Sequence, residues 1–200
     1  MGIASDLRAA RKLLRNAVRA RGTRRELAHR LEREGAGEPD AVRIVVYFAD
    51  TRVNLYQIRQ WYAPLAELAK THPVTILARS PGATLTLKDE SPVPVVYCRR
   101  ITEIEEFLGR HEVRMVFYVN QNTKNFQMFR YGRMWHVFIN HGESDKMYMT
   151  TNQYKAYDYA LVAGQAAIDR LSGKLWAYDV AAKAIPIGRP QTDHIVGEAP

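Results

Sequence analysis

Residues 135–149, WHVFINHGESDKMYM, place a histidine and several charged side chains directly after an apolar run. The run 137–139 favours a β-strand, which ends at Asn140 and is followed by His141 and Gly142. An imidazole titrates near neutral pH and can take a proton from a hydroxyl group, so His141 is a candidate general base. The adjacent glycine lets backbone or ligand approach closely. A lone histidine at a strand end is also commonly a structural hydrogen-bonding residue, and the residue types alone leave both interpretations open.

Polar side chains follow other apolar runs of the chain as well. They are Asp50, Thr51, Arg52 and Asn54 after the first run, Asn120, Gln121, Asn122, Thr123, Lys124 and Asn125 after a later one, and Glu143, Ser144, Asp145 and Lys146 after His141 and Gly142. Gly164 and Gln165 follow a further run and begin a predicted helix, whose first N–H groups suit an anion. In an open α/β sheet, ligands bind at the carboxyl ends of the strands. The pattern therefore predicts a site for a phosphorylated, hydroxylated ligand.

Several common chemistries lack their motifs. No glycine lies between Val42 and Pro81, so the Gly-rich turn of a dinucleotide-binding strand is absent, and no Walker sequence or nucleophile elbow occurs. The six histidines are scattered, so we expect neither a metal site nor another cofactor. Cys98, the single cysteine, lies in the apolar run VPVVYC, which favours a buried core residue and a reducing compartment.

The segments that would position these residues alternate between two patterns. Compact apolar runs at 42–49, 73–79, 92–98, 113–120, 136–140 and 159–164 predict strands, helical spacing at 55–72, 101–111 and 165–176 predicts helices, and a further apolar segment follows at 183–190. Strands without polar alternation, separated by helices, indicate a sheet buried on both faces. With 46% hydrophobic residues the chain can build such a core. We therefore predict an α/β fold with a mostly parallel sheet.

The positive charge is concentrated at the N-terminus. Residues 1–25 hold eight basic side chains and one acidic side chain, hence +7 of the net +8, and their apolar residues recur at helical spacing. We predict a basic amphipathic arm at 1–33, a Gly- and Pro-containing linker at 34–41, and a globular domain at 42–200. The arm could lie on an anionic membrane, dock on its own domain, or bind nucleic acid, the least favoured partner. No secretory signal or membrane-spanning stretch is expected, and the body is predicted to be cytosolic.

The stretch NHGESDKMYMTTNQYKAYDYALVAGQAAIDRL resembles the CDP-glycerol:poly(glycerophosphate) glycerophosphotransferases, which make teichoic acids and capsules. That family has a His-Gly pair after an apolar strand and a lysine four residues beyond the glycine, matched by His141, Gly142 and Lys146. Its strand, small residue and helix are matched by Asp158 to Gly164 and QAAIDRL, and IPIGRPQTD is similar to its later Gly-x-Pro-Arg segment. The likeness spans about 40–195. Glu143-Ser144 departs from the usual Thr-Pro.

The resemblance implies a GT-B architecture, in which two Rossmann-like domains face a cleft. This chain would then be the N-terminal, acceptor-side domain. His141 would be the catalytic base, and Gly142, Lys146, Asn120, Asn122, Gly164 and Gln165 would contact substrate. The donor would be CDP-glycerol, and the acceptor a lipid-linked polyol phosphate or glycan at the inner face of the cell membrane. The anionic membrane surface would contact residues 1–25. A C-terminal Rossmann-like domain would be missing, and the isolated chain inactive.

Two other functions remain open at this point. The first is one half of a GT-B nucleotide-sugar glycosyltransferase, in which the same histidine serves a glycosyl acceptor. The second is a non-enzymatic, basic-armed module that binds a membrane or nucleic acid.

Overall fold

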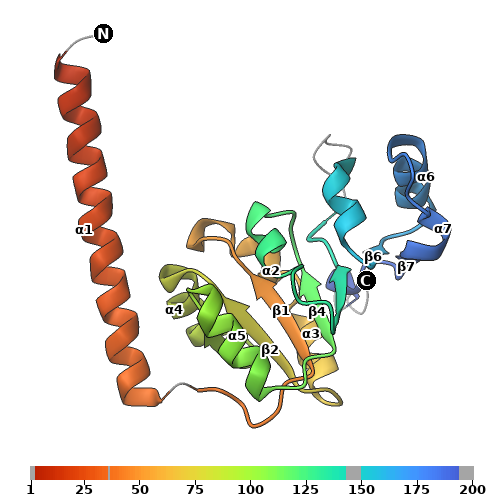
Figure 1. Cartoon of the computed structure of the whole chain (residues 1–200), viewed down its shortest axis with the longest axis horizontal. Helices are drawn as coiled ribbons and strands as arrows, with labels where there is room; N and C mark the ends of the chain where they lie inside the picture. Colours follow the sequence, from red (N-terminus) through yellow and green to blue (C-terminus); the bar gives the residue numbers. More distant parts are fainter. Residues whose placement is uncertain (1–2, 36, 143–149, 194–200) are drawn as a thin grey trace, which may run out of the picture.

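The computed structural model describes residues 3–35, 37–142 and 150–193 of the chain. Its strands are β1 (Ile44–Phe48), β2 (Val74–Ala78), β3 (Val95–Tyr97), β4 (Met115–Tyr118), β5 (Trp135–Phe138), β6 (Tyr159–Val162) and β7 (Ala184–Pro186). They form one seven-stranded sheet in the order β3-β2-β1-β4-β5-β6-β7, and every pairing between them is parallel (Figure 1). The prediction of an α/β fold with a parallel sheet is confirmed, and the strand order is that of a Rossmann-like sheet with a seventh strand.

Helices cover both faces of this sheet. They are α2 (Tyr56–Arg59), α3 (Tyr62–Ala69), α4 (Pro81–Glu90), α5 (Ile101–Arg110), α6 (Gln165–Lys174) and α7 (Val180–Lys183), with short 3-10 helices at Arg52–Asn54, Thr123–Gln127, Asn152–Ala156 and Pro190–Thr192. In β1, Val45 and Tyr47 pack into the core shared with α5 and α6, whereas the alternating Ile44, Val46 and Phe48 pack against α2, α3 and α4. Both faces are buried, which is why the strand reads as a continuous apolar run.

Two helical segments differ from the sequence prediction. The helix expected at 55–72 is divided into α2 and α3, which are separated by Gln60 and Trp61. Pro64 lies in the first turn of α3, where a missing N–H costs no hydrogen bond. The helix α4 was not predicted, because PGATLTLKDE carries little apolar periodicity and two threonines. Pro81 at its first position and the buried Ala83 and Leu87 explain why it forms here.

The basic arm is one long helix, α1 (Ile3–Glu34), that projects from the domain (Figure 1). Its C-terminal half is in contact with α4: Leu27 is buried, and Arg30 donates to Asp89 Oδ1 at 2.6 Å and to the carbonyl oxygen of Leu85 at 3.3 Å. Nearer its N-terminus the helix leaves apolar side chains in solvent, among them Leu13 and Leu14, which are 70% and 68% exposed. Within the described residues, docking on the domain therefore buries apolar side chains in only the C-terminal part of α1.

The segment between α1 and β1 has no regular secondary structure in its described residues, 35 and 37–43. Glu38 holds it to the end of α5: Arg110 donates to its two carboxylate oxygens at 3.1 and 2.9 Å, and His111 Nε2 lies 2.7 Å from Oε1. Burial opposes ionisation of Glu38, yet these hydrogen bonds leave its pKa below the ordinary value. Within the described residues, no helix combines the length and the apolar character needed to span a bilayer.

Candidate active site

A cavity of about 500 Å³ opens at the carboxyl ends of the central strands. Its lining residues are Asp50, Tyr56, Gln57, Asn120, Gln121, Asn122, Thr123, His141, Thr151 and Gln153. The chain order of the strands reverses between β1 and β4, and this cavity takes Asp50 from the end of β1 and Asn120 from the end of β4. Such a reversal leaves a crevice beyond the strand ends, where open α/β sheets bind their ligands. The topology and the cavity therefore indicate the same place.

The ring of His141 is fixed in one orientation by the neighbouring strand end. Its Nδ1 lies 2.8 Å from the carbonyl oxygen of Val119. A carbonyl oxygen can only accept, so Nδ1 carries the proton, and Nε2 of the neutral ring keeps a free lone pair. Tyr56 packs edge-on against the ring, with centroids 6.0 Å apart. An oriented imidazole with one unprotonated nitrogen beside a cavity can act as a general base.

The backbone around His141 has an unusual conformation. Asn140 has a φ of 59°, in the left-handed region that asparagine tolerates better than most residues. Its Oδ1 accepts from the His141 backbone N–H at 2.8 Å, and its carbonyl oxygen accepts from the indole N–H of Trp61. Gly142 has a φ of 142°, which disfavours any residue with a Cβ, although a Cβ there would meet only Gln60 Oε1 at 4.0 Å. Glycine is thus required by the backbone conformation and not by lack of space beside the ring.

Asn120 connects two other groups of the cavity. Its Nδ2 donates to Gln57 Oε1 at 2.5 Å and lies 3.3 Å from Asp50 Oδ2, while its Oδ1 accepts from the Asn122 backbone N–H at 3.2 Å. The other Asp50 oxygen accepts from the Thr51 N–H at 2.7 Å. These contacts hold a carboxylate and two amides against one another, which gives the cavity acceptors and donors suited to hydroxyl groups.

One amide of the cavity keeps an unused donor. Gln121 Oε1 accepts from Thr151 Oγ1 at 2.5 Å, whereas its buried Nε2 has no hydrogen-bond partner among the described residues. A buried unpaired N–H costs about 1–3 kcal/mol. A ligand oxygen that reached it would remove that cost.

Tyr157 stabilises the loop that carries Asn120 and Asn122 through hydrogen bonds to Asn125 and Gln153. Its hydroxyl oxygen accepts from Asn125 Nδ2 and from Gln153 Nε2, each at 3.1 Å. Asn125 Nδ2 also donates to the Asn120 carbonyl at 2.7 Å, and Gln153 Nε2 donates to the Asn122 carbonyl at 3.2 Å. Burial raises the pKa of Tyr157 to about 12, so the phenol stays neutral and the scaffold does not change with physiological pH.

A second, smaller cavity of about 100 Å³ lies beside the first, at the ends of β5, β6 and β7. Gly142 lines it together with Gln60, Ala163 and Arg189. Arg189 is the only cation that lines either of these two cavities within the described residues. The larger cavity thus offers amides and a carboxylate, and the smaller one adds a guanidinium that can bind phosphate.

The residues selected from the sequence have different positions in the structure. Asn120, Asn122 and His141 line the larger cavity and Gly142 the smaller one. Gly164 and Gln165 line neither, and the Gln165 amide donates to Asp169 at 2.7 Å. Lys146, Glu143 and Ser144 fall outside the described residues.

The structure also adds residues that the sequence did not single out. Tyr56 and Gln57 belong to α2, whereas Thr151 and Gln153 lie at the start of the 3-10 helix before β6. Their spacing in the sequence carries no signal for a site. Asp50, Gln121 and Thr123 were among the polar residues predicted at the strand ends, and they line the larger cavity. Arg189 was not selected, although it belongs to the segment IPIGRPQTD.

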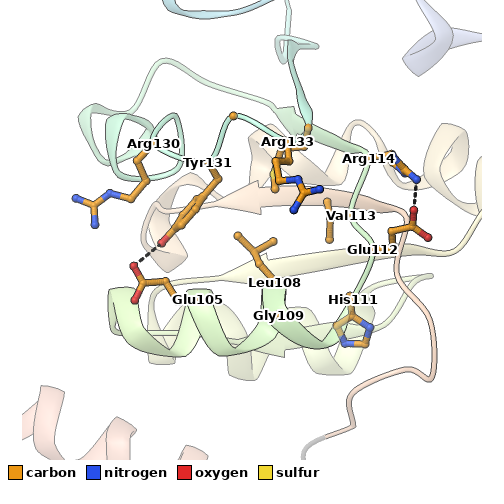
Figure 2. Close-up of a pocket in the computed structure, with 12 residues that line it drawn as sticks. Glu105, Leu108, Gly109, His111, Glu112, Val113, Arg114, Arg130, Tyr131 and Arg133 are labelled. Carbon is orange, nitrogen blue, oxygen red and sulfur yellow. Dashed lines mark hydrogen bonds and ion pairs between the residues drawn. The ribbon is translucent and has the colours of Figure 1, made fainter.

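A larger cavity, of about 610 Å³, lies elsewhere, between the end of α5 and the loop before β5 (Figure 2). It is at the amino ends of β4 and β5, away from the strand ends at which α/β sheets bind ligands. Several of its polar groups are already paired: Glu112 with Arg114, and Tyr131 with Glu105, as the dashed lines in Figure 2 show. Size alone therefore does not identify the active site.

His136, five residues before His141, shows what a structural histidine looks like in this fold. Its Nε2 lies 2.9 Å from the Tyr131 carbonyl oxygen, and its Nδ1 lies 2.7 Å from the Tyr118 hydroxyl. Both nitrogens are thus used within the protein, with Nε2 donating and Nδ1 accepting. Burial lowers the pKa of His136 and favours the neutral form. His141 differs because, of its two ring nitrogens, only Nδ1 has a hydrogen-bond partner among the described residues.

Three comparisons relate the chain to known proteins. No family model matches the sequence, and no curated protein matches it. Among solved structures, the chain is similar to the wall teichoic acid polymerase TagF, in a histidine-to-asparagine variant soaked with CDPG, with a TM-score of 0.51 and 11% identity. This chain has a Rossmann-like α/β fold, consistent with one half of a GT-B architecture. The match covers 99% of this chain and 52% of the TagF chain, so the chain spans about half the length of that neighbour. At this identity the similarity establishes the fold alone.

Proposed function

We propose that this chain is the acceptor-side half of a glycerophosphotransferase, which moves glycerol phosphate from CDP-glycerol to an acceptor hydroxyl in the synthesis of a teichoic-acid-like or capsular polymer. The observation that carries the proposal is the orientation of His141. Its Nδ1 donates to the Val119 carbonyl, and its Nε2, which has no partner among the described residues, is available to a ligand in the cavity where the strand order reverses. The fold shared with a teichoic acid polymerase supports the choice of reaction class.

In the proposed reaction, His141 Nε2 takes the proton of the acceptor hydroxyl as its oxygen bonds to the β-phosphorus of CDP-glycerol. The bond from that phosphorus to the bridging oxygen breaks, and CMP leaves. Transfer of phosphoryl groups depends mainly on positioning and on neutralising charge. The chain would supply the positioning through Asp50 and Asn120, which suit the hydroxyl groups of a polyol or sugar.

The positive charge that neutralises the diphosphate of the donor would come from residues outside the larger cavity. No lysine or arginine lines the larger cavity among the described residues, so this cavity suits the hydroxyl-bearing acceptor better than the diphosphate of the donor. Arg189 in the adjoining cavity and Lys146 are the candidates for contacts with phosphate. The remaining donor contacts would belong to a second Rossmann-like half, and without it we expect the chain to be inactive or nearly so.

A complete enzyme would test this proposal. The chain is expressed together with a C-terminal Rossmann-like half of the same architecture, and CMP release from CDP-glycerol is measured with a glycerol-phosphate oligomer as acceptor. We expect turnover that requires both halves and the oligomer. Release of CMP at the same rate without acceptor, or no release with any acceptor, would contradict the proposal.

A glycosyltransferase half is the second candidate, because the fold and an amide-rich cavity for hydroxyl groups serve a sugar transferase equally well. The same assay separates the two when nucleotide sugars replace CDP-glycerol. Turnover with a nucleotide sugar and none with CDP-glycerol would assign the chain to the second function.

A further inference from the structure

A small cavity of about 210 Å³ lies between α1 and the segment that joins β3 to α5, on a different part of the molecule from His141. Three arginines line it: Arg24 from α1, and Arg99 and Arg100 from the domain. Leu27 and Leu31 of α1 line its apolar side. The cavity exists because α1 is docked on the domain, so its charged residues come from two elements.

Within the described residues, only part of the positive charge of this cavity is neutralised. Glu103 is the only acidic lining residue, and its Oε2 already accepts from the backbone N–H groups of Arg99 and Arg100 at 2.6 and 2.9 Å. Its other oxygen lies 4.0 Å from the Arg100 guanidinium. Neither Arg24 nor Arg99 has an ion-pair partner within the described ranges. Three guanidinium groups against one carboxylate favour an anionic ligand.

Phosphate fits this arrangement better than other anions. A guanidinium presents a planar fork of N–H donors that matches two phosphate oxygens, and several such forks can hold one group. The volume of about 210 Å³ is below the range of about 300–1,000 Å³ that is usual for pockets holding whole small molecules. The cavity therefore suits a single phosphate group whose remainder extends outward, as in a lipid headgroup.

The remainder of α1 indicates where that phosphate comes from. Leu13 precedes Arg24 by eleven residues, about three helical turns, so both lie on the same side of the helix, roughly 16 Å apart along its axis. Leu13, Leu14 and Val18 are 70%, 68% and 64% exposed, and Arg11, Arg15 and Arg19 beside them are exposed as well. A helix with exposed leucines among arginines has the character of one that lies in the surface of an anionic membrane.

We propose that the cavity formed by Arg24, Arg99 and Arg100 binds the phosphate of an anionic lipid headgroup while α1 lies in the membrane surface. The bound lipid phosphate would contact both α1 and the globular domain. It would therefore fix how the domain is oriented above the bilayer. It extends the predicted contact of residues 1–25 with the membrane to two arginines of the globular domain. Neither the proposed reaction nor His141 is needed for it.

The experiment compares two double variants of the full chain with equal loss of charge. R24Q/R99Q removes one helix arginine and one domain arginine from the cavity. R33Q/R133Q removes one of each from exposed positions outside it and outside residues 1–25. Co-sedimentation is measured with vesicles containing phosphatidylglycerol and with phosphatidylcholine vesicles, and circular dichroism verifies that both variants retain the helix content of the parent chain. Inorganic phosphate is added in a second series, with sodium chloride of the same ionic strength as its control.

We expect R24Q/R99Q to weaken binding to the phosphatidylglycerol vesicles at least tenfold more than R33Q/R133Q. Inorganic phosphate should displace the parent chain more strongly than chloride does. Equal weakening by both variants would overturn the proposal, because diffuse attraction between charges does not depend on which arginines are removed. Binding of inorganic phosphate without any preference for phosphatidylglycerol vesicles would overturn the lipid source, as would a pocket-dependent affinity for duplex DNA that exceeds the affinity for vesicles.

Discussion

His141 Nδ1 lies 2.8 Å from the carbonyl oxygen of Val119, and this contact determines which ring nitrogen remains for a ligand. His136, on the same strand segment, has the opposite arrangement, because its Nε2 faces the Tyr131 carbonyl oxygen. The two histidines therefore provide a comparison within one protein.

The two neutral rings should be different tautomers. At mildly alkaline pH, the proton of His141 is expected on Nδ1 and that of His136 on Nε2. Long-range ¹⁵N–¹H correlation spectra of the imidazole rings measure this directly, with His136→Gln and His141→Gln used to assign the signals. An Nε2-protonated His141 would mean that the Val119 contact does not form and that no base faces the cavity.

Asn120→Asp should disturb the centre of the cavity. The substitution removes the donor to Gln57 Oε1 and places a second carboxylate near Asp50, where the present separation to the amide nitrogen is 3.3 Å. We expect a loss of about 1–3 kcal/mol in the free energy of unfolding at pH 7, measured in urea. The loss should diminish below about pH 4, where carboxylates protonate. Asn152→Asp, at an exposed position, is the control. Equal effects of the two variants would contradict the hydrogen bonds of Asn120 to Gln57 and Asp50.

Asn140 should tolerate glycine better than alanine. Its φ of 59° is accessible to glycine without strain, so Asn140→Gly loses only the hydrogen bond that the His141 N–H donates to Asn140 Oδ1. Asn140→Ala loses that bond and also adds backbone strain of about 1–2 kcal/mol. Thermal unfolding of both variants gives the difference. If alanine proved as stable as glycine, the left-handed conformation at this position would be wrong.

The stability of the domain should fall on mild acidification because of His136. Burial lowers its pKa in the folded state, so the unfolded chain binds a proton first, near the ordinary value of 6.5. The contribution of the neutral ring is complete above about pH 6.5 and is lost as the pH falls below it, by at most about 1.4 kcal/mol per pH unit. Urea unfolding between pH 5 and 8 should show this slope in the parent chain and in the exposed control His72→Gln. It should be reduced in His136→Gln; an unchanged slope there would assign the effect to another group.

Leu27→Ala should loosen α1 without unfolding the domain. Leu27 is 1% exposed and holds the helix to the domain, and truncation of a buried leucine costs about 2–5 kcal/mol. Hydrogen exchange of the amides in 10–34 is expected to become faster, whereas the strands stay protected. Leu14→Ala, at a position 68% exposed, should leave exchange unchanged. Faster exchange throughout the sheet would show that helix and domain unfold together.

The sequence predicted the sheet well because each strand is buried on both faces and therefore reads as an apolar run. Alternate residues of β1 pack into the two different hydrophobic cores, one on each face of the sheet. Alternate residues of the other central strands do the same. The helix α4 could not be predicted in this way. Pro81 favours a helix start locally, but the helix is stabilised by two apolar side chains that are buried in the domain, and this burial depends on the finished fold.

The candidate site was predicted in part. Asn120, Asn122 and His141 follow strands directly, so the topology of a parallel sheet brings them to one edge. Gln57 and Tyr56 could not be found, because they reach the cavity from α2 and the separation of α2 from α3 was not foreseen. Gly164 and Gln165 also follow a strand, but β6 is the second strand beyond β4, and they do not line the cavity.

The proposed role of His141 is tested most directly by the rate of CMP release from CDP-glycerol, measured with the completed two-half enzyme and a saturating acceptor. If His141 is the base, His141→Ala should lower kcat by about 10²- to 10⁴-fold and leave the KM for CDP-glycerol within a few-fold of the parent value. His72→Ala is the matched control and should have the parent rate. Normal turnover by His141→Ala would contradict the assignment.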